Sequence, residues 1–210
     1  LGHAGAGPAA CGLRQTDGPD GARRSDASAS SAFYSLEILK SMLYALVHYP
    51  AVELRSINLL RSKYDPQFHL IAPHITIMFP TPDSIGESSL VSHIESVLRR
   101  WESFPIRLKG LQQSWDEYLF LLLNKGVGDV IRLHEEIYAG LLSEYRNEVR
   151  PFIPHMTLGV FTGKNEEYAQ ALKEAERLNL DYECMLDRLH LIKVNAERSE
   201  IVWGKEFLFT

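Results

Sequence analysis

The chain has 210 residues, of which 45% are hydrophobic and 23% are charged, and its formal net charge at pH 7 is −5. These values are typical of a globular protein that forms one domain or one compact pair of lobes. The acidic balance argues against a surface that binds an extended nucleic-acid duplex, so any contact with nucleic acid should be local.

The cysteines and apolar runs exclude further classes. Cys11 and Cys184 are the two cysteines, which is neither a disulfide framework nor a zinc-ligand spacing. The apolar run at 119–123 is much too short to span a bilayer, and the first residues lack a basic segment followed by an apolar stretch. We therefore expect a monomeric cytoplasmic protein with no membrane partner, no metal and no other cofactor.

The first residues differ in composition from the rest of the chain. Gly, Ala, Ser and Pro make up 20 of residues 1–32. Such a stretch buries too little apolar surface to offset its ordering entropy, so residues 1–41 are predicted to be a disordered or weakly ordered extension. Translation that begins at Met42 would explain this extension; a genuine tail whose segment 33–40 packs as a short helix is the alternative.

From residue 42 onward the pattern predicts one series of elements and then a similar second series. The first series is a strand at 43–49, a helix at 52–64, a strand at 73–79, a helix at 86–101, and two strands at 104–109 and 118–124. The second series is a helix at 129–145, a strand at 153–161, a helix at 165–178, and strands at 186–195 and 200–209.

The repeated order predicts the fold class. Helix, strand, helix and hairpin occur twice in 42–210, which indicates internal duplication of layout. We predict an α+β, bilobal fold in which the duplicated units carry mainly antiparallel sheets about a pseudo-twofold axis.

A five-residue frame occurs once in each series, at the start of the third predicted element of one and the second of the other. Residues 73–77 read Pro-His-Ile-Thr-Ile, and residues 154–158 read Pro-His-Met-Thr-Leu. Successive side chains of a strand point to opposite faces, so each frame sets a histidine and a threonine on one face and two aliphatic residues on the other. Proline cannot donate to a sheet ladder and fits at the start of a strand.

These side chains suit phosphoryl chemistry. Histidine exchanges a proton near neutral pH, so His74 and His155 could act as a general base and a general acid. The hydroxyls of Thr76 and Thr157 could donate to non-bridging phosphoryl oxygens, where negative charge develops. For one histidine alone, a structural role would be the better interpretation; for two in matched frames we favour catalysis.

The paired frames and the duplicated layout resemble the 2H phosphoesterase superfamily, in the branch of bacterial 2′-5′ RNA ligase-like proteins and cyclic phosphodiesterases. The resemblance covers 42–210, including 61–66 before the first frame and 187–191 after the second. It implies a site between two lobes, with the two histidines as the acid/base pair and the two threonines as phosphate ligands. It further implies an enzyme that opens 2′,3′-cyclic phosphates or related cyclic nucleotide or RNA ends, or acts on 2′-5′ linkages. Opening a cyclic phosphodiester with an acid/base pair needs no metal, so we expect a metal-independent enzyme.

Four further residues are candidates for substrate binding. Tyr64, Phe79 and Phe161 flank the predicted histidine strands and could stack on a nucleobase, although packing in the core or at the rim is an equal alternative. Arg61 could steer a phosphate, but a helix end that faces water is the simpler interpretation. His134 begins a zinc-helix pattern whose second histidine is replaced, so it is predicted to lie on a solvated helix face.

Two other functions remain open at this stage. One is RNA 2′-5′ ligation, the reverse sense of similar phosphoryl chemistry. The other is a binding module that holds a nucleotide phosphate in the same cleft without turnover. The sequence does not distinguish them, because it does not show whether both imidazoles reach one phosphate.

Overall fold

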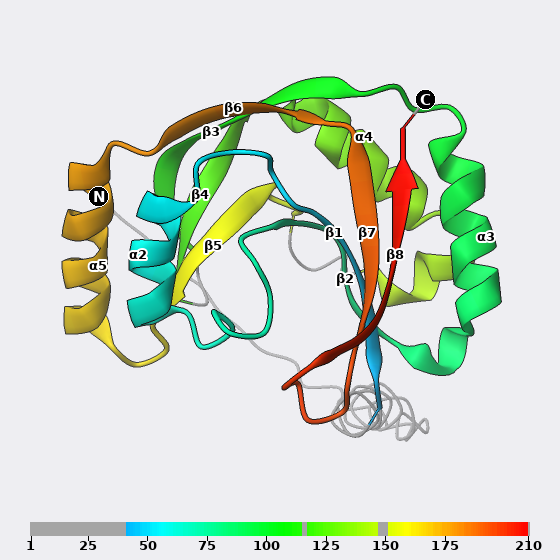
Figure 1. Ribbon diagram of the computed structural model, residues 1–210, viewed down its shortest axis with the longest axis horizontal. Coiled ribbons are helices and arrows are strands. Elements are labelled where there is room, and N and C mark those ends of the chain that lie inside the picture. The colour runs from blue at the N-terminus through cyan, green and yellow to red at the C-terminus, as the bar shows by residue number, and fades with distance from the viewer. Residues whose placement is uncertain (1–40, 115–116, 147–150, 210) are drawn as a thin grey trace, which may run out of the picture.

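The structure is a computed structural model that describes residues 41–114, 117–146 and 151–209 (Figure 1). The predicted extension lies outside these ranges up to residue 40, including the candidate helix at 33–40.

Eight strands of the described residues form a single sheet in which all paired neighbours are antiparallel. Their order across the sheet is β6-β3-β4-β5-β2-β1-β7-β8. The strands are β1 (Leu43–His48), β2 (Ile75–Pro82), β3 (Phe104–Gln113), β4 (Tyr118–Lys125), β5 (His155–Val160), β6 (Asp181–Leu186), β7 (Arg188–Val194) and β8 (Ile201–Leu208).

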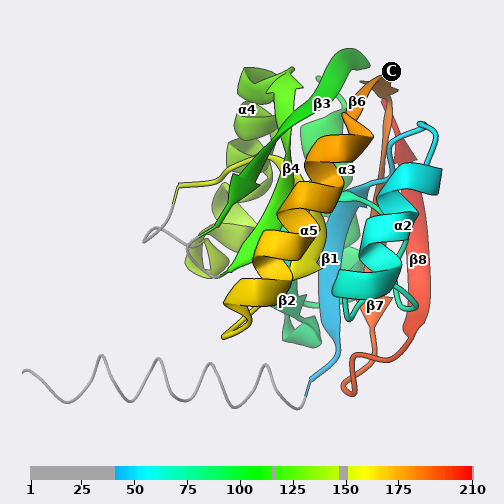
Figure 2. The same ribbon diagram turned by 90° about the vertical axis from the view of Figure 1, so that its left-hand side faces the viewer.

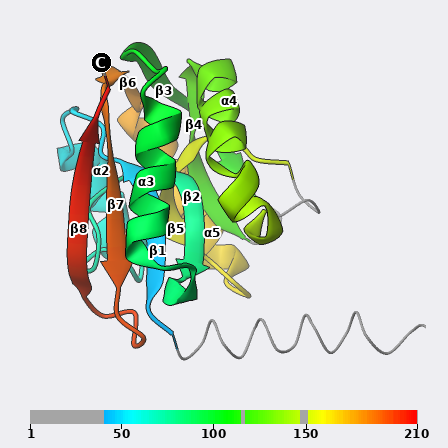
Figure 3. The same cartoon turned by 90° about the vertical axis from the view of Figure 1, so that its right-hand side faces the viewer.

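Helices cover the sheet in two groups. The helices are α2 (Arg55–Tyr64), α3 (Glu87–Leu98), α4 (Val127–Ile137) and α5 (Asn165–Leu178), with short 3-10 helices η1 (Asp83–Ile85) and η2 (Gly140–Tyr145). Helices α2 and α5 pack together beside β3, β4 and β5, and Figure 2 shows this pair in front of the sheet. Helices α3 and α4 pack together near β2, toward the other end of the molecule, as Figure 3 shows.

The prediction of a mixed, mainly antiparallel fold is confirmed, and the helix at 165–178 has the predicted bounds. Several other elements have ends that differ from the prediction by a few residues, and two elements differ in kind. The helix predicted at 129–145 is α4, which ends at Ile137, followed by η2, because Gly140 takes a positive φ of 65° that breaks the regular helix. Strand β6 was not predicted, because only Asp187 separates it from β7 and its apolar alternation is weak.

The sheet divides between β5 and β2 into two wings, β6-β3-β4-β5 and β2-β1-β7-β8. These wings do not correspond to the two halves of the chain. Strand β6 pairs with β3 of the first half, and β7 pairs with β1. Each wing therefore combines strands from both halves, whereas a simple duplication would give one lobe to each half. The duplicated units and the pseudo-twofold axis stay predictions.

The aliphatic residues of the two frames lie in the core, as alternation requires. Ile75, Ile77 and Met156 are completely buried and Leu158 is nearly so. Helix α2 packs against β5 and α4 packs against β2, so these two strands are covered on their aliphatic side. The core therefore fixes the face on which the polar residues of each frame must lie.

Candidate active site

The two frames are neighbours in the sheet. Strand β5 begins at His155, and His74 is the residue immediately before β2. These strands pair antiparallel through Ile75 and Met156. Residues directly opposite each other point to the same face, so the polar members of both frames share the face away from the core.

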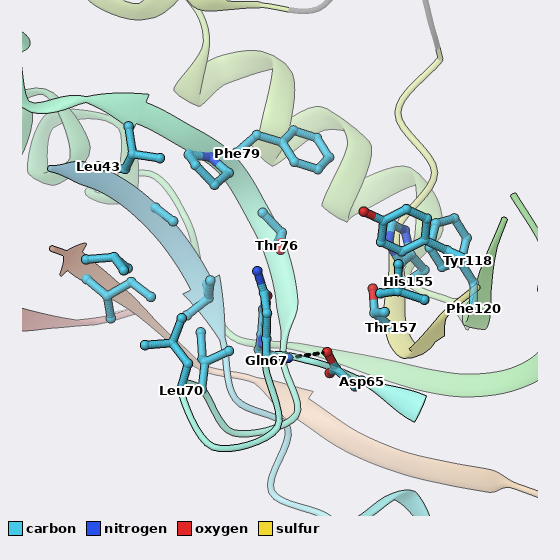
Figure 4. A pocket seen from close by; sticks show the side chains of 18 of the residues that line it. Leu43, Asp65, Gln67, Leu70, Thr76, Phe79, Tyr118, Phe120, His155 and Thr157 are labelled. Atoms are coloured by element: carbon cyan, nitrogen blue, oxygen red, sulfur yellow. Dashed lines mark hydrogen bonds between the residues drawn. The ribbon is translucent and has the colours of Figure 1, made fainter. Parts of the chain in front are cut away.

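All four polar residues of the frames line one pocket of about 630 Å³. Figure 4 shows Thr76 on β2 and, across the pocket, His155 and Thr157 on β5. His74 belongs to the same lining. All four side chains are half-buried, which leaves them open to a ligand while limiting access of water. The structure thus brings together the residues that the frames predicted for one site.

Each histidine is anchored through the same nitrogen. His74 Nδ1 donates to the carbonyl oxygen of Ala72 at 2.9 Å, and His155 Nδ1 donates to that of Ile153 at 2.6 Å. A carbonyl oxygen only accepts, so Nδ1 must carry the proton and Nε2 is the nitrogen free for chemistry. In both frames the acceptor lies two residues before the histidine, with the proline between them.

Burial sets the proton affinity of both rings. It lowers the pKa of His155 to about 4, against the opposing effect of the Ile153 carbonyl, and the charge of His74 lowers it further. Burial also lowers the pKa of His74, and the nearby Arg61 guanidinium adds to that effect. At neutral pH both imidazoles of the free protein are therefore neutral and can accept a proton at Nε2.

Arg61 reaches the pocket lining, although it does not face water as the simpler interpretation supposed. Its side chain is 2% exposed, its Nε donates to Asp65 at 2.8 Å, and one terminal nitrogen donates to the Ile71 carbonyl at 2.9 Å. Its other terminal nitrogen, Nη1, is buried without a hydrogen-bond partner among the described residues. The guanidinium therefore ties the end of α2 to the loop that leads into His74.

The three aromatic candidates for substrate binding lie in different surroundings. Phe79 is 40% exposed and lines the pocket, where Figure 4 shows it on β2 above Thr76. Tyr64 and Phe161 are absent from the lining, because their rings pack against each other at 5.5 Å and Phe161 is 1% exposed. The Tyr64 hydroxyl donates to Glu174 of α5. The structure places these last two in the packing between α2, β5 and α5.

His134 does not lie on a solvated helix face, which corrects the sequence prediction. It is 5% exposed, its Nδ1 donates to the Ile77 carbonyl at 2.8 Å, and its ring stacks on Phe152 at 3.8 Å. It lines the pocket together with Tyr138, one helical turn later at the C-cap of α4. Tyr138 accepts a hydrogen bond from the backbone N–H of Phe79. In the sequence, His134 and Tyr138 are four residues apart, and this spacing places both ring-bearing side chains on the same side of a helix.

Other pocket residues had no signal in the sequence. Strand β4 contributes Tyr118 and Phe120, and strand β1 contributes Leu43, Ala45 and Val47. These side chains come from strands whose neighbours the sequence does not specify. Their pairing with β5 and β2 brings them to the pocket.

Two absences hold for the part of the chain that the structure describes. No group of three or more His, Cys, Asp or Glu side chains there is arranged to hold a metal ion. None of the helices there is long and apolar enough to cross a membrane.

Comparison with known proteins gives the family. A model of the 2′-5′ RNA ligase superfamily matches residues 49–198. A Bacillus licheniformis protein provisionally named a phosphoesterase is 28% identical over 156 residues, which are 72% of this chain and 89% of that protein. A Bacillus cereus protein with the same provisional name is 30% identical over 139 residues, covering 64% of this chain and 78% of the other.

A solved structure of Escherichia coli LigT with 3′-AMP aligns with a TM-score of 0.47 and 15% identity, over 81% of this chain and 95% of LigT. The family match extends over both His-Thr frames and the elements between them. The chain belongs to the 2′-5′ RNA ligase superfamily, the 2H phosphoesterases.

Proposed function

We propose that this protein is a metal-independent phosphoesterase that opens 2′,3′-cyclic phosphates of nucleotides or RNA ends, with His74 and His155 as its acid/base pair. One observation carries the proposal: two His-Thr pairs from neighbouring strands line a single pocket, and each histidine has its Nδ1 tied to a carbonyl oxygen. The provisional phosphoesterase names of the two Bacillus relatives support the same class of reaction.

The reaction needs one proton acceptor and one proton donor. A neutral imidazole takes a proton through Nε2 from a water molecule, whose oxygen forms a bond to phosphorus. The bond from phosphorus to one ribose oxygen breaks, and the second imidazole, protonated, gives that oxygen its proton. The product is a nucleoside monophosphate. The Thr76 and Thr157 hydroxyls donate to the non-bridging oxygens, where charge accumulates in the transition state.

The protonated histidine must acquire its charge on substrate binding. Both rings are neutral in the free pocket at pH 7, because burial lowers the pKa of each. A phosphodiester carries a negative charge, and an opposite charge within about 4–6 Å raises the pKa of an imidazole. Substrate thus promotes protonation of one histidine. That proton lowers the pKa of the other, so one acid and one base result.

Arg61 and Phe79 have supporting roles in this proposal. The Arg61 guanidinium, paired with Asp65, fixes the loop before His74. The exposed ring of Phe79 supplies a wall for a planar base. Tyr64 and Phe161 serve packing instead of substrate binding. The described lining contains two arginines and no lysine, which favours small or single-stranded ends over a duplex as the substrate. The proposed enzyme is monomeric and cytoplasmic.

The test is a substrate screen in excess chelator. The purified protein is incubated with 2′,3′-cyclic nucleotides, oligonucleotides that end in a cyclic phosphate, and 2′-5′ dinucleotides. The proposal expects ring opening to a monophosphate that is unaffected by chelation. Activity that vanished with chelator and returned with one divalent ion would contradict it.

Two outcomes would favour the alternatives. Formation of 2′-5′ linkages from a cyclic phosphate and a 5′-hydroxyl would indicate ligation. Tight nucleotide binding without any turnover would indicate a binding module.

A further inference from the structure

Phe120 of β4 lies directly against one of the two proposed catalytic rings. The centroids of Phe120 and His155 are 3.5 Å apart and their planes differ by 22°, so the rings are stacked. In the β4–β5 ladder Phe120 is opposite Thr157, and Leu122 is opposite His155. A diagonal neighbour on the same face is within reach of an aromatic side chain, which explains how Phe120 covers the imidazole.

The stack and the backbone anchor act on different parts of the His155 ring. The bond from Nδ1 to the Ile153 carbonyl holds one edge of the ring. The face of Phe120, itself 8% exposed, blocks tilting and keeps water from one side of the imidazole. Nε2 is then the polar atom of this ring left to face the pocket.

The two histidines are not equivalent in this respect. His74 has the same anchor through Nδ1, but the ring of Tyr49 meets it edge-on with centroids 6.4 Å apart. Among the described residues no ring stacks face to face on His74. The matched frames therefore anchor the two histidines in the same way, and Phe120 of β4 further restrains His155.

We propose that Phe120 is a positioning residue for His155, whose ring fixes the plane of the imidazole and shields it from water so that Nε2 stays aimed at the pocket. The effect on the ring is independent of what the protein acts on. Its consequence for turnover rests on the proposed function.

The electrostatics agree with this geometry. Burial is the first cause of the lowered pKa of His155, and the stacked ring of Phe120 contributes to that burial. His74 is the charged or titratable group that acts on His155 across the β2–β5 pair. Removing the ring should admit water, reduce the desolvation, and raise the pKa of His155 toward its ordinary value of about 6.5.

The experiment follows the titration of the His155 ring by NMR, with the signal assigned by its loss in His155→Gln. The wild-type ring should be half-protonated near pH 4. Phe120→Leu should raise that midpoint by about one unit or more, because one face becomes hydrated. Phe120→Tyr keeps the ring and should keep the low midpoint. If Phe120→Leu does not fold, Phe120→Met supplies similar volume without an aromatic face.

A matched control is available at the other stacked histidine. Phe152 lies parallel to His134 at 3.8 Å, so Phe152→Leu removes a similar stack from a histidine without a proposed role in the reaction. It should change the titration of His134 and leave that of His155 in place. An unchanged His155 midpoint in Phe120→Leu would overturn the proposal, as would an equal shift in Phe152→Leu.

Kinetics separate this inference from the proposed function. Phe120→Leu should lower kcat roughly ten-fold or more with little change in KM, since small displacements of a catalytic group are costly. The same limb of the pH profile should shift with the NMR midpoint. A changed KM with an unshifted midpoint would make Phe120 a binding wall and overturn its positioning role. A shifted midpoint in a protein that turns over no substrate would support the positioning role and contradict the proposed function.

Discussion

Ile75 of β2 pairs with Met156 of β5, and this single pairing sets the register between the two His-Thr frames. Because the strands run antiparallel, His74 lies on the side of Thr157, and Thr76 lies on the side of His155. Both paired residues are completely buried, so a slip by one residue would drive histidines into the core. The hydrophobic core thereby fixes the geometry of a polar site.

The first prediction concerns the two histidines. His74→Ala and His155→Ala should each lose roughly 10²–10⁴-fold in kcat on a cyclic nucleotide, the usual contribution of general acid–base catalysis. The double variant should lose much less than the product of the single losses, because the pair acts as a unit. Single-turnover rates at saturating substrate provide the measurement.

Shape-preserving changes at the threonines are the comparison for this series. Thr76→Val and Thr157→Val should cost less than the histidine changes, since each removes one donor. Full turnover in both histidine variants with weakened nucleotide binding would contradict an acid/base role.

The second prediction concerns stability against pH. The pKa of His155 is about 4 in the folded protein and about 6.5 in the unfolded chain. Between these values the unfolded state binds more protons, so the free energy of unfolding should fall as pH is lowered from about 6.5 to about 4. In His155→Gln this decrease should be smaller, because one of the contributing groups is gone. Urea unfolding at pH 7 and pH 4.5 measures both proteins; equal decreases would show that His155 does not contribute.

The third prediction concerns the buried pair of Arg61 and Asp65. Their side chains are 2% and 5% exposed, so removal of one partner leaves an uncompensated buried charge. Arg61→Met should lower the free energy of unfolding by about 3–5 kcal/mol. It should also reduce kcat, because the loop from Asp65 to His74 loses the hydrogen bond at Ile71. Denaturant titration and steady-state kinetics test the two effects.

The matched variant for this pair is Arg61→Met combined with Asp65→Leu, which removes both charges. It should recover part of the stability but not the hydrogen bond to Ile71. If the single variant were as stable as the wild type, the pair would have no part in holding this loop.

The fourth prediction concerns Phe79 and Phe161, which were equal candidates for substrate binding from the sequence. Phe79→Leu should raise KM for a nucleotide with little effect on stability, because its ring is 40% exposed at the pocket. Phe161→Leu should lower the free energy of unfolding by roughly 1–2 kcal/mol through lost packing and leave KM unchanged. Steady-state kinetics with a cyclic nucleotide and thermal unfolding provide the readouts. A KM effect confined to Phe161→Leu would reverse this assignment.

The sequence by itself determined the local features of this protein. The two frames specified which face of each strand is polar, because alternation depends only on the residue order. Asn179 takes a left-handed conformation that ends α5, so the helix at 165–178 was predictable from its own residues. The frames and the repeated layout also indicated the family that the comparisons then showed.

Only the tertiary structure decided which segments meet. A strand's sequence specifies its buried face but not its partner, so the exchange of strands between the wings and the β2–β5 pairing were not predictable from pattern. The same holds for single side chains. Phe120 reaches His155 from a neighbouring strand, His134 is buried by contact with Phe152, and Phe161 enters the core against Tyr64. Each contact joins residues distant in the chain, and close packing across such distances leaves no periodic mark in the sequence.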